Sequence, residues 1–339
     1  MKIIIPMAGM GKRMRPHTLT VPKPLLPIAG KPIVQRLVED LAKVAGEEIE
    51  EVGFIIKESF GEEVENKLKE VAASVGAKGS IYYQGEALGT AHAVLCAKDM
   101  MEGKMMLAFA DTLFKADFNL DTSKDGMIWV QKVDDPSSFG VVEMNDQNEI
   151  TGFVEKPDEF ISDLAIIGVY YFRDANYLKN ELQYVIDNNI LDKGEFQVTS
   201  ALDNMRKKGT IFVPATVSEW LDCGNKDVTV NTNQRYLEFI KDENLVSQNA
   251  EIQNSIVIPP VYIGENVKLH NSVVGPHVSV GDNTMISDSR VKNSIIQKDS
   301  SVKDANIANS MIGNFVHYQG TPSDVSLGDF NTVKGLYDN

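Results

Sequence analysis

The chain has 339 residues, 43% of them apolar, and carries a net charge of −15. This length exceeds one ordinary hydrophobic core and predicts two domains, while the acidity argues against nucleic acid or anionic membranes as partners. Two cysteines, Cys96 and Cys223, are too few for a disulfide framework or a thiolate metal cluster. The apolar start Ile3–Ile5 ends at Pro6, well short of a signal peptide or a membrane span, so we expect a cytoplasmic protein.

Up to about residue 236, short apolar runs alternate with amphipathic stretches, which predict strands and helices respectively. The expected strands cover Lys2–Pro6, Val52–Ile56, Ser80–Tyr83, Met105–Ala110 and Ala165–Phe172, with a hairpin of Gly140–Met144 and Ile150–Val154. The expected helices cover Pro32–Val44, Glu62–Val75 and Thr90–Met100, the last capped by Thr90. This order predicts an α/β domain with a mixed, mainly parallel sheet and ligands beyond the carboxyl ends of its strands.

The pattern changes after residue 249. A segment of Asn, Ser and two aliphatic residues starts at Asn254 and recurs, at unequal intervals, at Asn271, Asn293 and Asn309. Hexapeptide units run through this region, and three such repeats to a coil are typical of a parallel β-helix. We therefore expect an α/β domain over residues 1–236, a linker helix over 237–248, a β-helix domain over 249–330 and a tail over 331–339.

The N-terminus is a basic island in an acidic chain. Glu39 is the first acidic residue, and the segment before it contains seven cations interleaved with glycines and prolines. This distribution predicts a site for a polyanion, and a small phosphorylated ligand is our preferred candidate. The alternative is an N-terminus that is basic without a functional reason.

The loop Met7–Pro16 follows the first expected strand. Its glycines allow successive N–H groups to face one phosphate, and three cations, Lys12, Arg13 and Arg15, add charge-assisted contacts. A dinucleotide-binding fingerprint would need glycine in place of Met14, and a phosphate loop of the Walker type would need a different glycine spacing, so both are excluded.

Together with Lys23-Pro24-Leu25-Leu26-Pro27, this loop resembles the opening signature of the sugar nucleotidyltransferases, the nucleoside-diphosphate-sugar pyrophosphorylases. The resemblance continues in order through five further segments: Gln84 with Leu88–Ala91, Asp111, Ser138–Val142, Phe153–Pro157 and Trp220–Gly224. It implies a Rossmann-like nucleotidyltransferase domain followed by a left-handed parallel β-helix. Some residues depart from the family pattern without removing a charged group: Ala8, Lys12 where threonine is usual, Ala110, and Asn225-Lys226.

The resemblance also implies roles for individual residues. The proposed nucleotide-binding residues are Ala8, Gly9, Gly11, Gln84 and Gly89, and the proposed catalytic cations are Arg13, Lys23 and Lys156. Gly140, Glu155 and Lys156 would hold the sugar phosphate, and Asp111 and Asp222 would hold Mg²⁺, which prefers carboxylate oxygens and phosphates. Taken singly, Asp111 could be a helix cap, Asp222 a surface turn residue and Lys156 a solvated lysine.

The expected reaction transfers a nucleotidyl group from a nucleoside triphosphate to a sugar 1-phosphate. The Gln84 amide can pair with O4 and N3–H of thymine or uracil, so we expect glucose 1-phosphate with dTTP first and UTP second. N-acetylglucosamine 1-phosphate and mannose 1-phosphate remain alternatives, as does a non-catalytic regulatory subunit. A β-helix acyltransferase ranks last, because only three or four coils are expected. We expect no nucleic acid or membrane partner, and a homo-oligomer.

Overall fold

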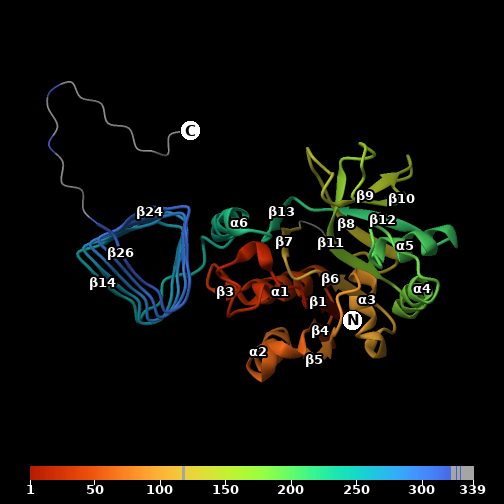
Figure 1. Cartoon of the computed structure of the whole chain (residues 1–339), viewed down its shortest axis with the longest axis horizontal. Coiled ribbons are helices and arrows are strands. Elements are labelled where there is room, and N and C mark those ends of the chain that lie inside the picture. The colour runs from red at the N-terminus through yellow and green to blue at the C-terminus, as the bar shows by residue number, and fades with distance from the viewer. Residues whose placement is uncertain (117–118, 322–325, 327–328, 330–339) are drawn as a thin grey trace. The chain divides into compact units, whose positions relative to one another are not determined.

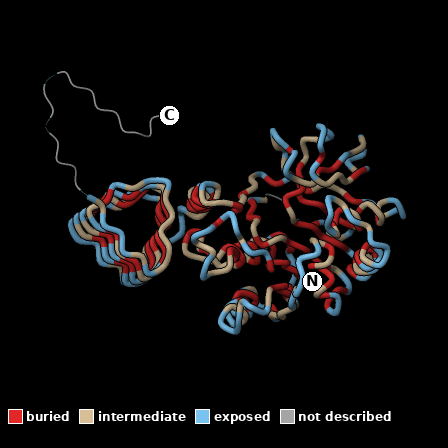
Figure 2. Tube along the Cα trace, viewed as in Figure 1, coloured by how far each residue is buried: buried red, intermediate tan, exposed pale blue. Residues whose placement is uncertain are grey.

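The computed structural model describes residues 1–116, 119–321, 326 and 329. The chain divides into two compact units, Met1–Tyr236 and Leu237–Asn339 (Figure 1). Each unit has its own buried hydrophobic core, and Figure 2 shows these buried positions inside both. Each unit is therefore described by itself.

The N-terminal unit is built on one mixed sheet. Its strands are β1 Lys2–Pro6, β4 Glu51–Ile56, β5 Lys78–Tyr83, β6 Met105–Ala108, β8 Gly126–Lys132, β9 Gly140–Met144, β10 Ile150–Glu155, β11 Leu164–Phe172 and β12 Phe212–Thr216. The strand order is β10-β9-β11-β6-β1-β4-β5, and β8 pairs with both β11 and β12. Strands β5, β4, β1 and β6 are parallel, whereas β11 is antiparallel to β6, β8 and β9. The mixed sheet expected from the sequence is present.

The helices of this unit are α1 Ile33–Ala45, α2 Gly61–Ala73, α3 Thr90–Leu95, α4 Ala175–Asp187, α5 Val198–Lys207 and all but the last turn of α6 Lys226–Phe239. Short 3₁₀ segments are η1 Lys12–Met14, η2 Lys23–Leu25, η3 Glu58–Phe60 and η4 Lys98–Met100. Helix α1 buries Ile33, Leu37, Leu41 and Val44, whose spacing along one helix face had predicted it.

The helix expected over Thr90–Met100 is shorter than predicted and is not capped by Thr90. It ends at Leu95, and Thr90 is its first helical residue. The Thr90 hydroxyl instead accepts a hydrogen bond from the backbone N–H of Val198, the first residue of α5 (3.0 Å). Thr90 therefore satisfies a free N–H at the start of a helix that is remote in sequence.

Two short ribbons lie off the main sheet. Strands β2 (Pro27–Ile28) and β3 (Lys31–Pro32) form a hairpin directly after η2. Strands β7 (Thr112–Lys115) and β13 (Glu219–Asp222) pair antiparallel, with Asp222 opposite Thr112. The second ribbon brings the end of β13 next to the residue that precedes β7, which is Asp111.

In the C-terminal unit, the described residues form three parallel sheets, β14-β17-β20-β23-β26, β15-β18-β21-β24 and β16-β19-β22-β25, an arrangement that fits a β-helix (Figure 1). Their bounds are β14 Glu251–Gln253, β15 Ile256–Val257, β16 Val261–Ile263, β17 Lys268–His270, β18 Val273–Val274, β19 Val278–Val280, β20 Met285–Ser287, β21 Arg290–Lys292, β22 Ser294–Ile296, β23 Ser301–Lys303, β24 Asn306–Ala308, β25 Met311–Ile312 and β26 His317–Gln319. Val257 pairs with Val274, Val274 with Val291 and Val291 with Ile307, so these residues hold equivalent positions in successive coils. Their numbering shows that one coil is slightly shorter than three full hexapeptides.

The recurring Asn-Ser segments occupy two different corners of the coil. Asn254 stacks on Asn271, and Asn271 donates a hydrogen bond to Asp288, whereas Asn293 stacks on Asn309. All five residues have φ between 42° and 52°, the left-handed region in which asparagine and aspartate are tolerated. The interval between Asn271 and Asn293 is wider than the others because these two residues lie at different corners of the coil.

The linker helix expected over residues 237–248 is wrong in its position. Helix α6 covers Lys226–Phe239, and residues 240–248 form turns and a single bridge residue, Val246. Asn225 sets the start of α6, because its side chain accepts hydrogen bonds from the N–H groups of Asp227 and Val228 and thereby caps the helix. No helix among the described residues is long and apolar enough to cross a membrane.

Candidate active site

Two cavities lie beyond the carboxyl ends of β1 and β6. The loop cavity, about 430 Å³, is lined by the Met7–Arg13 region together with Lys23, Gln84 and Gly89. The hairpin cavity, about 720 Å³, is lined by residues of the β9–β10 hairpin, α5 and β13. Both cavities are of the size that holds small ligands. Four residues line both cavities: Arg13, Thr90, Phe109 and Asp111.

The glycine-containing loop turns sharply at Gly11, which has φ +56° and precedes η1. A Cβ at this position would lie 3.0 Å from Cβ of Lys23 and 3.2 Å from Cγ2 of Thr18. The Thr18 hydroxyl donates a hydrogen bond to the Gly11 carbonyl (2.8 Å), which fixes the turn. Glycine is needed here both for the left-handed backbone and for the close approach of Lys23.

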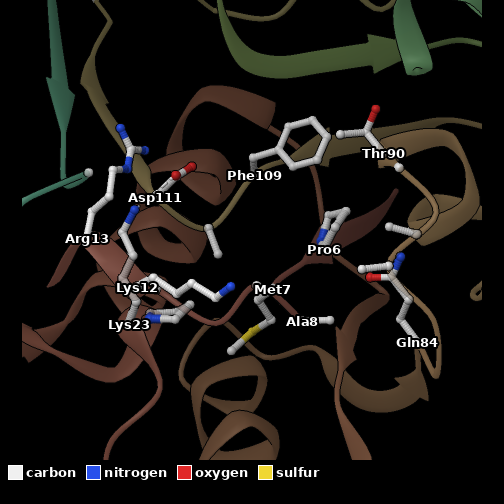
Figure 3. A pocket seen from close by; sticks show the side chains of 18 of the residues that line it. Pro6, Met7, Ala8, Lys12, Arg13, Lys23, Gln84, Thr90, Phe109 and Asp111 are labelled. Atoms are coloured by element: carbon white, nitrogen blue, oxygen red, sulfur yellow. Dashed lines mark hydrogen bonds and ion pairs between the residues drawn. The ribbon is translucent and has the colours of Figure 1, made fainter. Parts of the chain in front are cut away.

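Lys23 forms an ion pair with Asp111 at the floor of the loop cavity. Its Nζ lies 3.0 Å from Oδ2 of Asp111, and the lysine side chain is only 10% exposed whereas the aspartate is 44% exposed. In Figure 3, Lys12, Arg13, Lys23 and Asp111 gather at one end of the cavity. A cation held this deep has a fixed position before any ligand arrives, which is the condition for electrostatic preorganisation.

The second carboxylate, Asp222, lies beside Asp111. The pairing of β7 with β13 brings the two together, and the N–H of Cys223 donates a hydrogen bond to the Asp111 carbonyl (3.0 Å). Burial, followed by the negative charge of Asp111, raises the pKa of Asp222, although Lys23 and Arg13 act in the opposite direction. Because a cation would offset the repulsion between these two carboxylates, the pair is a favourable cation-binding site.

These two carboxylates fit a Mg²⁺ ion that is also bound by the phosphates of a nucleotide. Among the described residues, no group of three or more His, Cys, Asp or Glu side chains gathers as in an all-protein metal site. Mg²⁺ is usually bound by one or two carboxylates, with phosphates and water completing its shell. Asp111 and Asp222 would supply such a pair.

The opposite end of the loop cavity carries Gln84 (Figure 3). The Gln84 amide nitrogen lies 3.4 Å from Nδ1 of His92, and its backbone N–H donates to the Ile56 carbonyl. The amide is therefore available as a paired donor and acceptor at the rim of the cavity. His92 is the neighbour that orients this amide.

The hairpin cavity contains a partly buried carboxyl group and an exposed amine. Burial raises the pKa of Glu155, whose Oε2 accepts a hydrogen bond from Thr199 (3.4 Å). Lys156 follows with φ +42°, and its Nζ lies 3.7 Å from Glu155. The Trp220 ring packs edge-on against Phe139 with centroids 4.8 Å apart, forming an apolar wall. The combination of carboxyl, hydroxyl and amine suits a sugar that carries a phosphate.

A segment between the two cavities holds none of the site residues proposed from the sequence. Gln197 is 5% exposed, and its Oε1 accepts a hydrogen bond from Thr90 (2.9 Å) while its Nε2 donates to Glu195. The N–H of Ala91 also bonds to the Phe196 carbonyl, and a Cβ on Gly89 would clash with that oxygen. In the sequence, the only signal for this contact is the pair Gly89-Thr90. Its partners, Phe196 and Gln197, lie more than a hundred residues further along the chain.

Every residue to which the resemblance gave a nucleotide, catalytic, sugar-phosphate or metal role lines one or both cavities, whereas Arg15 of the predicted phosphate-binding loop lines neither. The loop cavity is lined by Ala8, Gly9, Gly11, Arg13, Lys23, Gln84, Gly89 and Asp111. The hairpin cavity is lined by Arg13, Asp111, Gly140, Glu155, Lys156 and Asp222. Phe109 and Gln197 also line these cavities and were missed, since Phe109 lay inside an expected apolar strand.

Comparison with known proteins identifies the family. The family profile described as nucleotidyl transferase matches residues 2–238. The chain belongs to the nucleotidyl transferase family. This nucleotidyl transferase is 32% identical over 266 residues to the low-salt glycan biosynthesis nucleotidyltransferase Agl11 of Haloferax volcanii, covering 76% of this chain and 72% of that protein.

Two further relatives differ in how much of their length is matched. Glucose-1-phosphate thymidylyltransferase of Streptomyces griseus is 29% identical over 351 residues, covering 95% of this chain and 94% of that protein. Bifunctional protein GlmU of Methanococcus maripaludis is 30% identical, but the nucleotidyl transferase covers only 62% of its length. The crystal structure of apo UDP-glucose pyrophosphorylase superposes with a TM-score of 0.58 at 24% identity, covering 70% of this chain and 98% of that one, which shows the shared fold.

Proposed function

We propose that this nucleotidyl transferase uses Mg²⁺ to transfer a nucleotidyl group from dTTP or UTP to a sugar 1-phosphate, with glucose 1-phosphate as the first candidate. The observation that carries this proposal is the pair of adjoining cavities that share Arg13 and Asp111. One cavity has phosphate-binding groups and an amide, and the other has groups suited to a sugar phosphate. The reacting ends of two anionic substrates would meet at the shared wall.

The chemistry requires positioning and neutralisation of charge more than a covalent intermediate. An oxygen of the sugar 1-phosphate attacks the α-phosphorus, the bond from that phosphorus to the bridging oxygen breaks, and pyrophosphate leaves with the electron pair. Both substrates are strongly anionic, so their repulsion must be offset before they approach. Binding energy and preorganised charge suffice for such an in-line displacement.

Each residue has a proposed task that follows from its place. The N–H groups of the Gly9–Gly11 loop bind the triphosphate, Arg13 stabilises the leaving pyrophosphate and Lys23 bridges phosphates near the reaction centre. Lys156 binds the phosphate of the sugar substrate, and Glu155 accepts hydrogen bonds from its hydroxyl groups. When bound at Asp111 and Asp222, Mg²⁺ would offset the charge of the phosphates.

The choice of base and sugar rests on two kinds of support. The Gln84 amide in the loop cavity matches the O4 and N3–H edge that thymine and uracil share. The nearly full-length similarity to a glucose-1-phosphate thymidylyltransferase favours glucose 1-phosphate. The proposal also includes a left-handed coil for the β-helix, in keeping with its hexapeptide pattern. It further includes a homo-oligomer, whose size light scattering in solution would test.

The test is to incubate the protein with Mg²⁺, glucose 1-phosphate and, separately, dTTP, UTP, CTP, GTP or ATP while following pyrophosphate release. We expect release with dTTP or UTP that disappears in Asp111→Asn. The matched control is Asp146→Asn, which removes an exposed carboxylate on the β9–β10 turn and should leave the rate unchanged. Silence with every nucleotide and with N-acetylglucosamine 1-phosphate or mannose 1-phosphate would favour a non-catalytic subunit.

A further inference from the structure

One face of α6 is buried but polar. Thr229, Thr232, Asn233 and Tyr236 follow one another at helical spacing, which places them on one side of the helix. Their exposed fractions are 0%, 1%, 0% and 4%. A buried helix face is normally apolar, because a buried polar group is unfavourable unless it is hydrogen-bonded. The partners of these four side chains therefore explain why they are there.

Thr232 holds the backbone of the second carboxylate. Its hydroxyl donates a hydrogen bond of 2.6 Å to the carbonyl oxygen of Asp222. One turn earlier, the Thr229 hydroxyl donates to the Asn225 carbonyl (2.6 Å) and lies 3.5 Å from the sulfur of Met14, which belongs to η1 of the glycine loop. These two threonines thus contact the end of β13 and the loop that carries Arg13.

Asn233 holds the hairpin that follows Lys23. Its Oδ1 accepts a hydrogen bond from the N–H of Ala29 (2.9 Å), a non-glycine residue with φ +48°. The same residue is held from α1, because Arg36 donates to the carbonyls of Ala29 (2.5 Å) and Ile28 (3.2 Å). The Tyr236 ring lies 4.5 Å from the Arg36 guanidinium and completes this clamp. A left-handed alanine persists only where its surroundings over-determine it.

We propose that the polar face of α6 is a positioning element that sets Asp222 and Lys23 relative to each other. The inference rests on the proposed function, because that function defines the reaction that Asp222 and Lys23 serve. The contacts of α6 do not depend on it. Thr232 fixes the carboxylate side of the centre, and Asn233 fixes the hairpin attached to the catalytic cation. Both side chains lie on one rigid helix, so the helix transmits one fixed spacing to both groups. Neither residue lines either of the two cavities described above, so each acts only through another residue.

The test compares Thr232→Val, which removes only the hydroxyl, with Thr232→Ser, which keeps it. Changes in groups that orient a metal ligand typically cost about 10- to 100-fold in metal affinity or activity. We expect Thr232→Val to lower kcat and to raise the half-saturating Mg²⁺ concentration, each by about that factor, with KM for glucose 1-phosphate unchanged. Thr232→Ser should stay within about threefold of wild type. A calorimetric titration with UTP and Mg²⁺, without sugar phosphate, reads the same effect independently of turnover.

A destabilised control separates positioning from folding. Val230→Ala lies on the same helix, is 2% exposed in the native chain and should lower the melting temperature without changing kcat or the Mg²⁺ dependence. Equal losses in Val230→Ala and Thr232→Val, or a Thr232→Val enzyme within threefold of wild type, would overturn the inference. A wild type that is silent in turnover contradicts the proposed function, and unaltered UTP binding by Thr232→Val then still contradicts the positioning role.

A second pair of variants covers the case in which Thr232→Val does not fold. Asn233→Ala should reduce kcat because Ala29 loses its partner, and adding Ala29→Gly should restore part of the loss, because glycine adopts a positive φ without strain. No restoration in the double variant would mean that Asn233 acts only through overall stability.

Discussion

Lys23 and Lys156 are both proposed to bind phosphate, yet their surroundings differ. Lys23 is nearly buried and already paired with Asp111, whereas the Lys156 side chain is 53% exposed and lies 3.7 Å from Glu155. An exposed pair contributes little by itself, so Lys156 is expected to bind only when a phosphate is present. Lys23 is instead positioned in advance, and its removal also leaves a carboxylate without its partner.

We therefore predict that Lys23→Ala lowers kcat about 100- to 1,000-fold, the cost of removing one group that stabilises developing charge. Lys156→Ala should fall near the same range while leaving circular dichroism and melting temperature unchanged. Lys132→Ala, which removes an exposed lysine paired with Asp163, is the matched control and should have no effect on turnover. A loss of less than about threefold for either site lysine would remove it from the mechanism.

Elements meet in ways that the sequence predicts only in part. The strands Lys2–Pro6 and Gly140–Met144 were predicted with correct bounds, because apolar runs and alternation are local signals. The proposed site residues came from segments that resemble a known family, and they line the two cavities. The polar face of α6 was not predicted, since the bond from Ala29 to Asn233 joins two ends of the N-terminal unit that are far apart in sequence. Gln197 escaped for the same reason. The helix expected over 237–248 was misplaced although the Asn225 cap that sets the start of α6 is a local signal.

The contact between α1 and α6 carries a titrating group. Asp40 on α1 is 15% exposed and accepts a hydrogen bond from the Tyr236 hydroxyl (3.2 Å). Burial raises the pKa of Asp40 to about 6, against the opposing effects of Lys43, Tyr236 and Arg36. The folded protein therefore holds this proton more tightly than the unfolded chain. The resulting stabilisation is complete below about pH 4 and is lost as the pH rises through about 6.

We predict that Asp40→Asn gains stability relative to wild type by about 2–3 kcal/mol between pH 4 and pH 7, as measured by urea unfolding at several pH values. Asp203→Asn is a control of opposite sign. Although burial alone would raise it, the pKa of Asp203 is lowered by hydrogen bonds from Lys207 and Arg206, so its contribution is present above about pH 4 and lost as the pH falls. Parallel pH profiles for wild type and Asp40→Asn would contradict the assignment.

At the scale of the whole molecule, the two units have separate cores and are stabilised by different means. The N-terminal unit relies on a covered sheet, whereas the C-terminal unit repeats one coil and adds ladders of side chains along its corners. In one ladder, Asn271 accepts a hydrogen bond from Asn254 (2.7 Å) and donates one to Asp288 (3.0 Å). Each corner residue also holds a left-handed backbone that most side chains disfavour.

We predict that Asn271→Ala destabilises the C-terminal unit by about 1–2 kcal/mol, through the left-handed backbone and the lost ladder bonds. Asn271→Gly should recover the backbone part and leave only the ladder part. Hydrogen exchange of amides in β17 and β20 is the measurement, and amides of β1 and β4 are the internal control. If Asn271→Ala and Asn271→Gly destabilise the unit equally, the lost stability comes wholly from the ladder hydrogen bonds and not from the left-handed backbone.

The nearly constant length of the coils has a consequence for how the length of the C-terminal unit can change. Removing one complete coil joins a corner to the equivalent corner of its neighbour, so each buried aliphatic residue still meets another and left-handed positions, most of them asparagine or aspartate, still align with one another. Removing a single hexapeptide shifts every later side chain onto the wrong sheet. Insertions and deletions in this unit are therefore tolerated in whole turns, and its length is quantised.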